Sequence, residues 1–128
     1  MKKNEITIII EKPIEVVFEF TTNPKNTHVW IPSIHQEVAD EFPPKIGTQY
    51  KNRSKDSGWD FYKVTKYVQG RIFALSDLDD NYHVQYSFKK LNNNRTKMTY
   101  LEWMNVGELK NPFTETILQN LKNCLEET

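Results

Sequence analysis

One carboxylate is expected among bulky side chains in the second half of the sequence. Residues 82–89 alternate between apolar and polar side chains, which is the period of a half-buried β-strand. If residues 96–105 return beside this strand, Glu102 and Tyr100 face the same interior as Tyr82 and Tyr86. A carboxylate enclosed there could act as a general acid or anchor a ligand. Two alternatives stay open: Glu102 faces solvent, or a bulge beyond Thr99 exchanges the two faces.

Aromatic residues make up 12% of the chain and could line a pocket for a flat or hydrophobic molecule. A tyrosine in such a pocket offers an apolar ring and one hydroxyl that orients the ligand. Simple core packing would use the same residue types, so both interpretations stand. The candidate ligand-binding residues are Trp30, Tyr50, Trp59, Tyr86, Tyr100, Glu102, Ile117 and Leu121.

The residues that most often bind metals or attack substrates are few and scattered. His28, His35 and His83 share no ligand spacing with one another or with Cys124, so neither a metal site nor a cofactor is expected. His28 or His35 could still donate a hydrogen bond near a cavity mouth, whereas His83 is expected in solvent. No catalytic motif is recognisable, and the catalytic residues stay unknown. A single cysteine cannot form an intramolecular disulfide, which fits a reducing cytoplasm.

The sequence predicts a C-terminal amphipathic helix more clearly than any other element. Between Phe113 and Thr128, apolar residues recur every three or four positions and form one stripe: Ile117, Leu121, Cys124 and Leu125. This stripe needs an apolar partner, and the sheet that precedes it is the only large one available. A helix lying across a curved sheet is expected to enclose a cavity.

The remaining sequence predicts strands over 4–11, 34–39, 47–54, 59–67, 71–76, 82–89 and 96–105. Two short helices are expected after the first strand, over 13–20 and 24–29, the second capped by Asn23. Short turns between neighbouring strands imply an antiparallel meander. The prediction is therefore one α+β domain over residues 1–128, in which a curved antiparallel sheet of about seven strands wraps around a long C-terminal helix.

The charge balance argues against one class of partner. Lys plus Arg and Asp plus Glu number 17 each, so the basic surplus typical of nucleic-acid-binding proteins is missing. The apolar run at residues 6–10 is too short for a signal peptide core or a membrane span. We therefore expect a cytoplasmic protein, a monomer or homodimer, with no nucleic-acid partner.

The order of these elements resembles the START/polyketide-cyclase-like superfamily, also called SRPBCC or Bet v 1-like, which has the helix-grip fold. Ile6-x-Ile8 and Pro13-x-x-x-Val17-Phe18 resemble its opening strand and first helix, and Leu121-Lys122-x-x-Leu125-Glu126 resembles its closing helix. Four further motifs match between them: Asn23-Pro24 with Trp30-x-Pro32, Ile46-Gly47-x-x-Tyr50, Val64-x-x-Tyr67-x-x-Gly70-Arg71 and Thr96-Lys97-Met98-Thr99-Tyr100.

The superfamily serves many functions, so the resemblance leaves three hypotheses. The first is binding of a small hydrophobic or aromatic molecule, such as a lipid, polyketide or other metabolite, between the sheet and the last helix. The second is a polyketide cyclase- or dehydratase-like enzyme in which a tyrosine and Glu102 move protons. The third is a co-chaperone-like interaction module. Convergence of Glu102 with a tyrosine hydroxyl would favour the enzyme, and an interior filled by side chains would favour the module.

Overall fold

The computed structural model describes residues 1–127 and contains the expected elements in the expected order. Most predicted boundaries agree within two residues, and the last helix ends at Glu126; Thr128, where it was predicted to end, lies outside the described residues. The elements are β1 (Lys3–Ile10), α1 (Ile14–Thr22), the 3-10 helix η1 (Pro24–Asn26), α2 (Thr27–Trp30), β2 (Gln36–Ala39), β3 (Gln49–Arg53), β4 (Asp60–Val68), β5 (Ile72–Asp77), β6 (Tyr82–Asn92), β7 (Arg95–Met104) and α3 (Glu115–Glu126).

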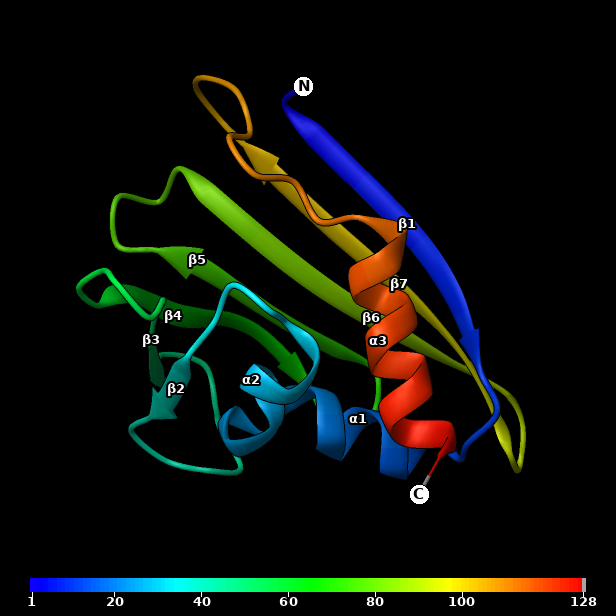
Figure 1. Cartoon of the computed structure of the whole chain (residues 1–128). Helices are drawn as coiled ribbons and strands as arrows, with labels where there is room; N and C mark the ends of the chain where they lie inside the picture. Colours follow the sequence, from blue (N-terminus) through cyan, green and yellow to red (C-terminus); the bar gives the residue numbers. More distant parts are fainter. Residues whose placement is uncertain (128) are drawn as a thin grey trace.

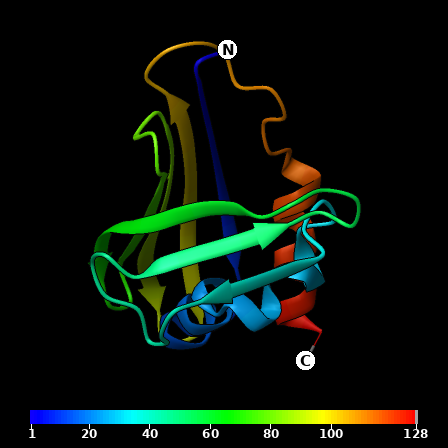
Figure 2. The ribbon, with the colours of Figure 1, turned by 90° about the vertical axis from the view of Figure 1, so that its left-hand side faces the viewer.

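The seven strands form one antiparallel sheet in the order β1-β7-β6-β5-β4-β3-β2. Its two ends differ in direction: β2, β3 and β4 run across the line of β1 and β7, so the sheet curls around one side (Figure 1 and Figure 2). The pairing in β4 shifts by one residue between Val64 and Lys66, a bulge of the kind that bends strands. The helices lie on the concave side, and the predicted helix-grip fold is confirmed.

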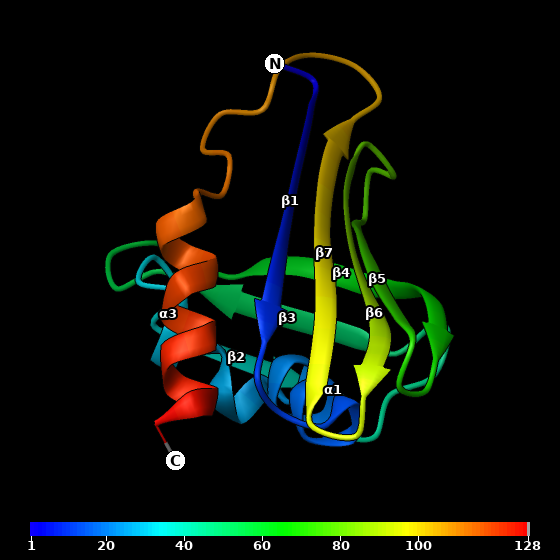
Figure 3. The ribbon, with the colours of Figure 1, turned by 90° about the vertical axis from the view of Figure 1, so that its right-hand side faces the viewer.

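Helix α3 stands beside β1 and closes that end of the concave side (Figure 3). The Thr114 hydroxyl caps its first turn by accepting a hydrogen bond from the Ile117 amide at 3.3 Å. The buried stripe is Leu118, Leu121 and Leu125, each almost completely enclosed. Ile117, which the sequence analysis placed in the stripe, lies at its half-buried margin, and Leu118 takes the central position.

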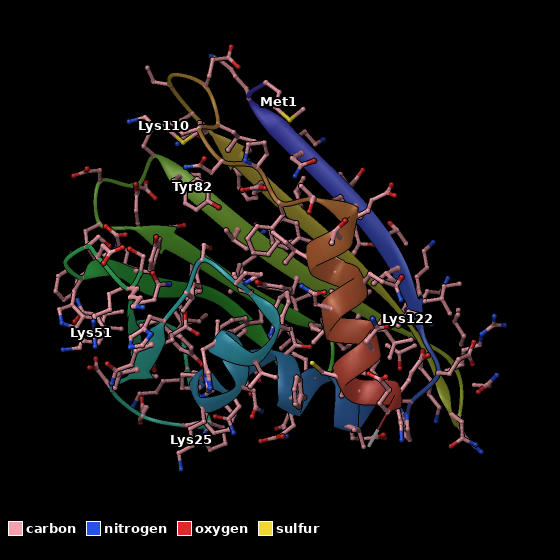
Figure 4. The ribbon with its side chains drawn as sticks, in the orientation of Figure 1. Met1, Lys25, Lys51, Tyr82, Lys110 and Lys122 are labelled. Atoms are coloured by element: carbon pink, nitrogen blue, oxygen red, sulfur yellow. The ribbon has the colours of Figure 1, made fainter. Side chains whose placement is uncertain are left out.

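Polar contacts also fasten α3 to β1. The Lys122 ammonium, which points toward β1 in Figure 4, donates to the Ile9 carbonyl at 2.7 Å and pairs with Glu126 at 2.6 Å. The Glu126 carboxylate in turn accepts the Glu11 amide at 2.8 Å. The apolar stripe and these bonds together fix the helix along the sheet edge.

The register of β6 and β7 determines which side chains face the interior. Tyr86 pairs with Tyr100 and Val84 with Glu102, and the pairing shifts only between Lys90 and Asn92, near the hairpin tip. The alternative bulge beyond Thr99 is therefore absent. Glu102 faces the concave side and is 1% exposed, so of the alternatives that the sequence left open the structure has the inward orientation.

Candidate functional site

An open cavity of about 560 Å³ lies on the concave face of the sheet. Strands β2 to β7 contribute one wall, and α2 with residues 108–113, the segment that leads into α3, contributes the other. Figure 4 shows Tyr82 on the sheet and Lys110 on this segment, both at the same end of the molecule. The side chains of α3 do not line the cavity, so it lies beside that helix rather than beneath it.

Four aromatic rings form a continuous apolar wall. Phe113 stacks on Tyr100 with ring centroids 4.3 Å apart and only 4° between the planes. Tyr100 meets Tyr86 edge to face at 5.3 Å, and Trp30 meets Tyr86 at 6.4 Å and Phe113 at 6.2 Å in the same manner. Such edge-to-face and offset contacts hold the rings in place, so this wall is formed before any ligand arrives.

Three buried polar atoms in the cavity wall have no hydrogen-bond partner among the described residues. They are the indole Nε1 of Trp30, the hydroxyl of Thr21 and the hydroxyl of Tyr100. The Tyr100 hydroxyl lies near that of Tyr82 without a well-formed hydrogen bond. Because most buried polar atoms in proteins are paired, the unpaired Trp30 Nε1 and Thr21 hydroxyl are the atoms that an added polar group could pair with.

Glu102 is held by three protein donors. Its Oε2 accepts the Asn4 side-chain amide at 2.9 Å and the Phe113 backbone amide at 2.7 Å, and its Oε1 accepts the Tyr82 hydroxyl at 2.7 Å. The same Asn4 amide also donates to the Phe113 carbonyl at 2.9 Å. Glu102 therefore joins β1, β7 and the segment before α3, and satisfies its carboxylate without a cation.

A second carboxylate, Glu37 on β2, lies in the opposite part of the wall. Its Oε1 accepts the Thr27 hydroxyl at 2.5 Å and its Oε2 accepts the Asn52 side-chain amide at 3.1 Å. Burial raises the pKa of Glu37 above its ordinary value of 4.5, and these two hydrogen bonds act in the opposite direction. Glu37 is half-buried and so remains more accessible from the cavity than Glu102.

The tyrosines between the two carboxylates keep their protons at neutral pH. Burial raises the pKa of Tyr62 to about 12, with a further contribution from the charge of Asp60. Burial likewise raises the pKa of Tyr86 and Tyr100, and burial followed by the charge of Glu102 raises that of Tyr82. These hydroxyls are consequently hydrogen-bond donors and acceptors rather than anions.

The structure brings together four of the predicted binding residues and separates the other four. Trp30, Tyr86, Tyr100 and Glu102 line the cavity. The rest lie elsewhere: Tyr50, Trp59, Ile117 and Leu121.

The four residues outside the cavity each have a clear structural reason for their position. Tyr50 is buried against Phe73, and its hydroxyl donates to the Thr22 carbonyl at 2.8 Å. Leu121 is buried in the core and Ile117 packs at its margin. Trp59 precedes β4, where the Lys51 ammonium lies 4.7 Å and the Arg53 guanidinium 5.3 Å from its ring, in contacts typical of cation–π pairs.

The histidines do not contribute to the cavity. His28 and His35 are exposed and do not line it. The expectation that His83 is solvated is wrong: it is 9% exposed, stacks on Trp103 at 4.9 Å and has Nδ1 2.6 Å from the Ser76 hydroxyl. Among residues 1–127, no three His, Cys, Asp or Glu side chains gather in a way that could hold a metal ion.

Sequence reasoning did not identify Glu37, Thr27 or Phe113 as site residues. In β2 the alternation is misleading, because Val38 is the exposed residue and Glu37 the one that faces the cavity. Phe113 was expected only as the start of the last helix. The one available signal was its position directly before the Thr114 cap, where a segment must cross from β7 to α3.

Comparison with known proteins supports the fold. No protein-family model matches the chain, and no curated protein matches it in sequence. Among solved structures, a START superfamily protein from Mycobacterium smegmatis is similar with a TM-score of 0.77 and 14% identity, over 99% of both chains. The chain has the START-type helix-grip fold.

Two further structures extend this similarity. The Aha1 dimer from Colwellia psychrerythraea gives a TM-score of 0.73 with 17% identity, covering 98% of this chain and 97% of that one. Ara h 8.0201 gives a TM-score of 0.64 with 13% identity over 98% of both chains. Within the part of the chain that is described, no helix is long and apolar enough to cross a membrane.

Proposed function

We propose that this protein binds a small molecule with an aromatic or hydrophobic body in the cavity on the concave face of its sheet. The observation that carries the proposal is the set of unpartnered buried polar atoms around an aromatic wall. Trp30 Nε1 in particular can only donate a hydrogen bond, and no described residue accepts it. A bound molecule with a suitable acceptor would satisfy this atom, while its apolar part packs on the rings of Tyr86 and Phe113.

The size of the cavity is consistent with such a ligand. Small-molecule sites commonly measure about 300–1,000 Å³ and are lined mainly by apolar and aromatic groups with a few polar ones. The cavity here, of about 560 Å³, lies within that range. A small-molecule partner, a cytoplasmic location and a monomeric or homodimeric state are retained as parts of the same proposal.

Enzymatic activity is the second candidate, because Glu102 and the Tyr82 hydroxyl meet at 2.7 Å. That contact is the convergence the sequence analysis associated with a cyclase- or dehydratase-like enzyme. We favour binding, since Glu102 is 1% exposed and already accepts three hydrogen bonds from the protein. A general acid or base must reach the substrate proton directly or through one water molecule, and these bonds instead give Glu102 a structural role.

Filling the cavity tests the binding function. Leu75, half-buried on β5, lines the cavity, so the larger side chain of Leu75→Trp would occupy the space available to a ligand. Leu91→Trp makes the same change at a position that is 41% exposed and outside the cavity. The probe is the neutral fluorophore N-phenyl-1-naphthylamine, whose emission rises in an apolar site.

We expect the wild type and Leu91→Trp to give the same saturable rise in fluorescence. Leu75→Trp should reduce the affinity for the probe by about tenfold or more, equivalent to the loss of about 1.4 kcal/mol of binding free energy. Equal binding by all three proteins would place the probe elsewhere and contradict the proposal. Thermal unfolding of each variant establishes that the comparison is made on folded protein.

A further inference from the structure

Charged side chains are distributed unevenly around the cavity. Among residues 1–127, its interior contains two carboxylates, Glu37 and Glu102, and no lysine, arginine or histidine. Lys110, the one basic residue that the described part of the chain contributes to the wall, is exposed on the segment before α3 (Figure 4). Two more acids, Asp60 and Glu108, lie at the exposed rim. The interior therefore has acidic groups without a compensating basic group.

Neither interior carboxylate is part of an ion pair among the described residues. Both are held by neutral donors alone: the Thr27 hydroxyl and Asn52 amide for Glu37, and the Asn4 amide, Tyr82 hydroxyl and Phe113 amide for Glu102. Neutral donors orient a carboxylate without cancelling its charge. An anionic ligand in this cavity would be repelled by these carboxylates, because no neighbouring cation within residues 1–127 offsets their charge.

Glu37 is the carboxylate available to a ligand. Glu102 is 1% exposed and has three donors, whereas Glu37 is half-buried, lines the cavity and has two donors. A carboxylate has about four sites for accepting hydrogen bonds, so Glu37 can accept more from a bound molecule. The wall thus offers an acceptor at Glu37 and an unpartnered donor at Trp30 Nε1.

We propose that the ligand is a neutral or cationic molecule, above all an amine with a flat apolar body, and that the cavity discriminates against carboxylates such as fatty acids. This inference rests on the proposed function and adds the charge class of the ligand. In the complex, the ammonium group of an amine donates to Glu37, and its ring packs on the wall formed by Trp30, Tyr86, Tyr100 and Phe113.

Three probes that share one ring system isolate the effect of charge. At pH 7, 2-naphthylmethylamine is a cation, 2-naphthylmethanol is neutral and 2-naphthoate is an anion. Isothermal titration calorimetry on the whole chain should give the lowest Kd for the amine, an intermediate value for the alcohol and a Kd at least about tenfold higher for naphthoate than for the amine.

Two variants test whether Glu37 causes the preference. Glu37→Gln should bring the Kd values for amine and naphthoate to within about threefold of each other, because the carboxylate that a ligand can contact is gone and Glu102 is enclosed. Glu5→Gln removes an equivalent charge from an exposed position on β1 and should leave the preference unchanged. The melting temperature of each variant is measured alongside, so that loss of binding is not confused with loss of fold.

The possible outcomes separate this inference from the function on which it rests. If naphthoate binds as tightly as the amine, or if Glu37→Gln keeps the full preference, the charge class is wrong while the cavity remains a binding site. If none of the three probes binds the wild type, both the charge class and the proposed function are contradicted. A preference for the amine that depends on Glu37 supports both.

Discussion

Glu37 and Glu102 are carboxylates in the wall of one cavity, yet they are held in different ways. Three donors from three separate segments surround Glu102, and it is almost completely enclosed. Glu37 has two donors and faces the open space of the cavity. Under the proposed function, this difference gives Glu102 a structural role and Glu37 the contact with the ligand. For the same reason, removing the charge of Glu37 should raise the stability of the protein, and removing that of Glu102 should lower it.

Removing the charge of Glu37 should stabilise the protein at neutral pH. Burial raises the pKa of Glu37 in the folded state, and Tyr50, Tyr62 and Tyr86 face its charge from β3, β4 and β6. Below pH 4.5 Glu37 is mostly protonated in both the folded and the unfolded chain, so its burial does not lower the free energy of unfolding. As the pH rises through the raised pKa, the unfolded state gains from ionisation first, and stability is lost.

Glu37→Gln has no such loss, so its melting temperature should exceed that of the wild type at pH 7. In a chain of this length, each 1 kcal/mol of added stability raises the melting temperature by about 3–5 °C. The difference in melting temperature between Glu37→Gln and the wild type should decrease as the pH falls toward 4. The melting temperature of Glu5→Gln should equal that of the wild type at every pH. A wild type that is the more stable protein at pH 7 would mean that the hydrogen bonds from Thr27 and Asn52 outweigh the cost of burial.

The sequence allowed an inward orientation of Glu102 as one of several alternatives and offered no indication for Glu37, and the reason is the length of the strands that carry them. The alternation on β6 extends over several residues and pairs with β7, so only one register puts the apolar residues inside. β2 has four residues and lies at the sheet edge, where Val38 is 38% exposed. Too few side chains of β2 are buried for its pattern to fix an orientation.

At the scale of whole elements, the order of strands and helices followed from local signals, but the rotation of α3 about its axis did not. Ile117 and Leu118 are adjacent apolar residues, and either could begin a stripe with a period near 3.6 residues. The contacts of α3 with β1, α1 and α2 decide in favour of Leu118. The same contacts fill the space beneath the helix, which is why the cavity lies beside it.

Because α3 buries Leu118 more deeply than Ile117, we expect truncation of these two residues to lower the free energy of unfolding by different amounts. Leu118→Ala removes a completely buried side chain and should lower the free energy of unfolding by about 2–5 kcal/mol. Ile117→Ala removes a side chain of similar size at the half-buried margin, and should cost less than half as much. Urea denaturation of both variants measures the difference. Equal losses would mean that the helix is rotated so that both residues share the interface.

At the scale of the whole molecule, Glu102 links the first strand to two parts near the C-terminal end of the chain. Its bonds to Asn4 and Phe113 connect the first strand, the last strand and the segment that enters α3. Both backbone polar groups of Phe113 are used, and its ring is consequently held against Tyr100 in the cavity wall. One buried carboxylate therefore connects the sheet, the segment that leads into α3 and the aromatic wall.

Loosening this link should expose the segment before α3 without unfolding the protein. Asn4→Ala removes the donor to Glu102 and to the Phe113 carbonyl, and a hydrogen bond to a charged group contributes about 1.5–3 kcal/mol. Amide hydrogen exchange in residues 107–113 should therefore accelerate by about tenfold or more. Thr7→Ala is the matched control, because it breaks an exposed contact of 3.2 Å with Thr99 between the same two strands. Acceleration by both variants, or throughout the chain, would show that Asn4 supports the sheet in general rather than the cavity wall.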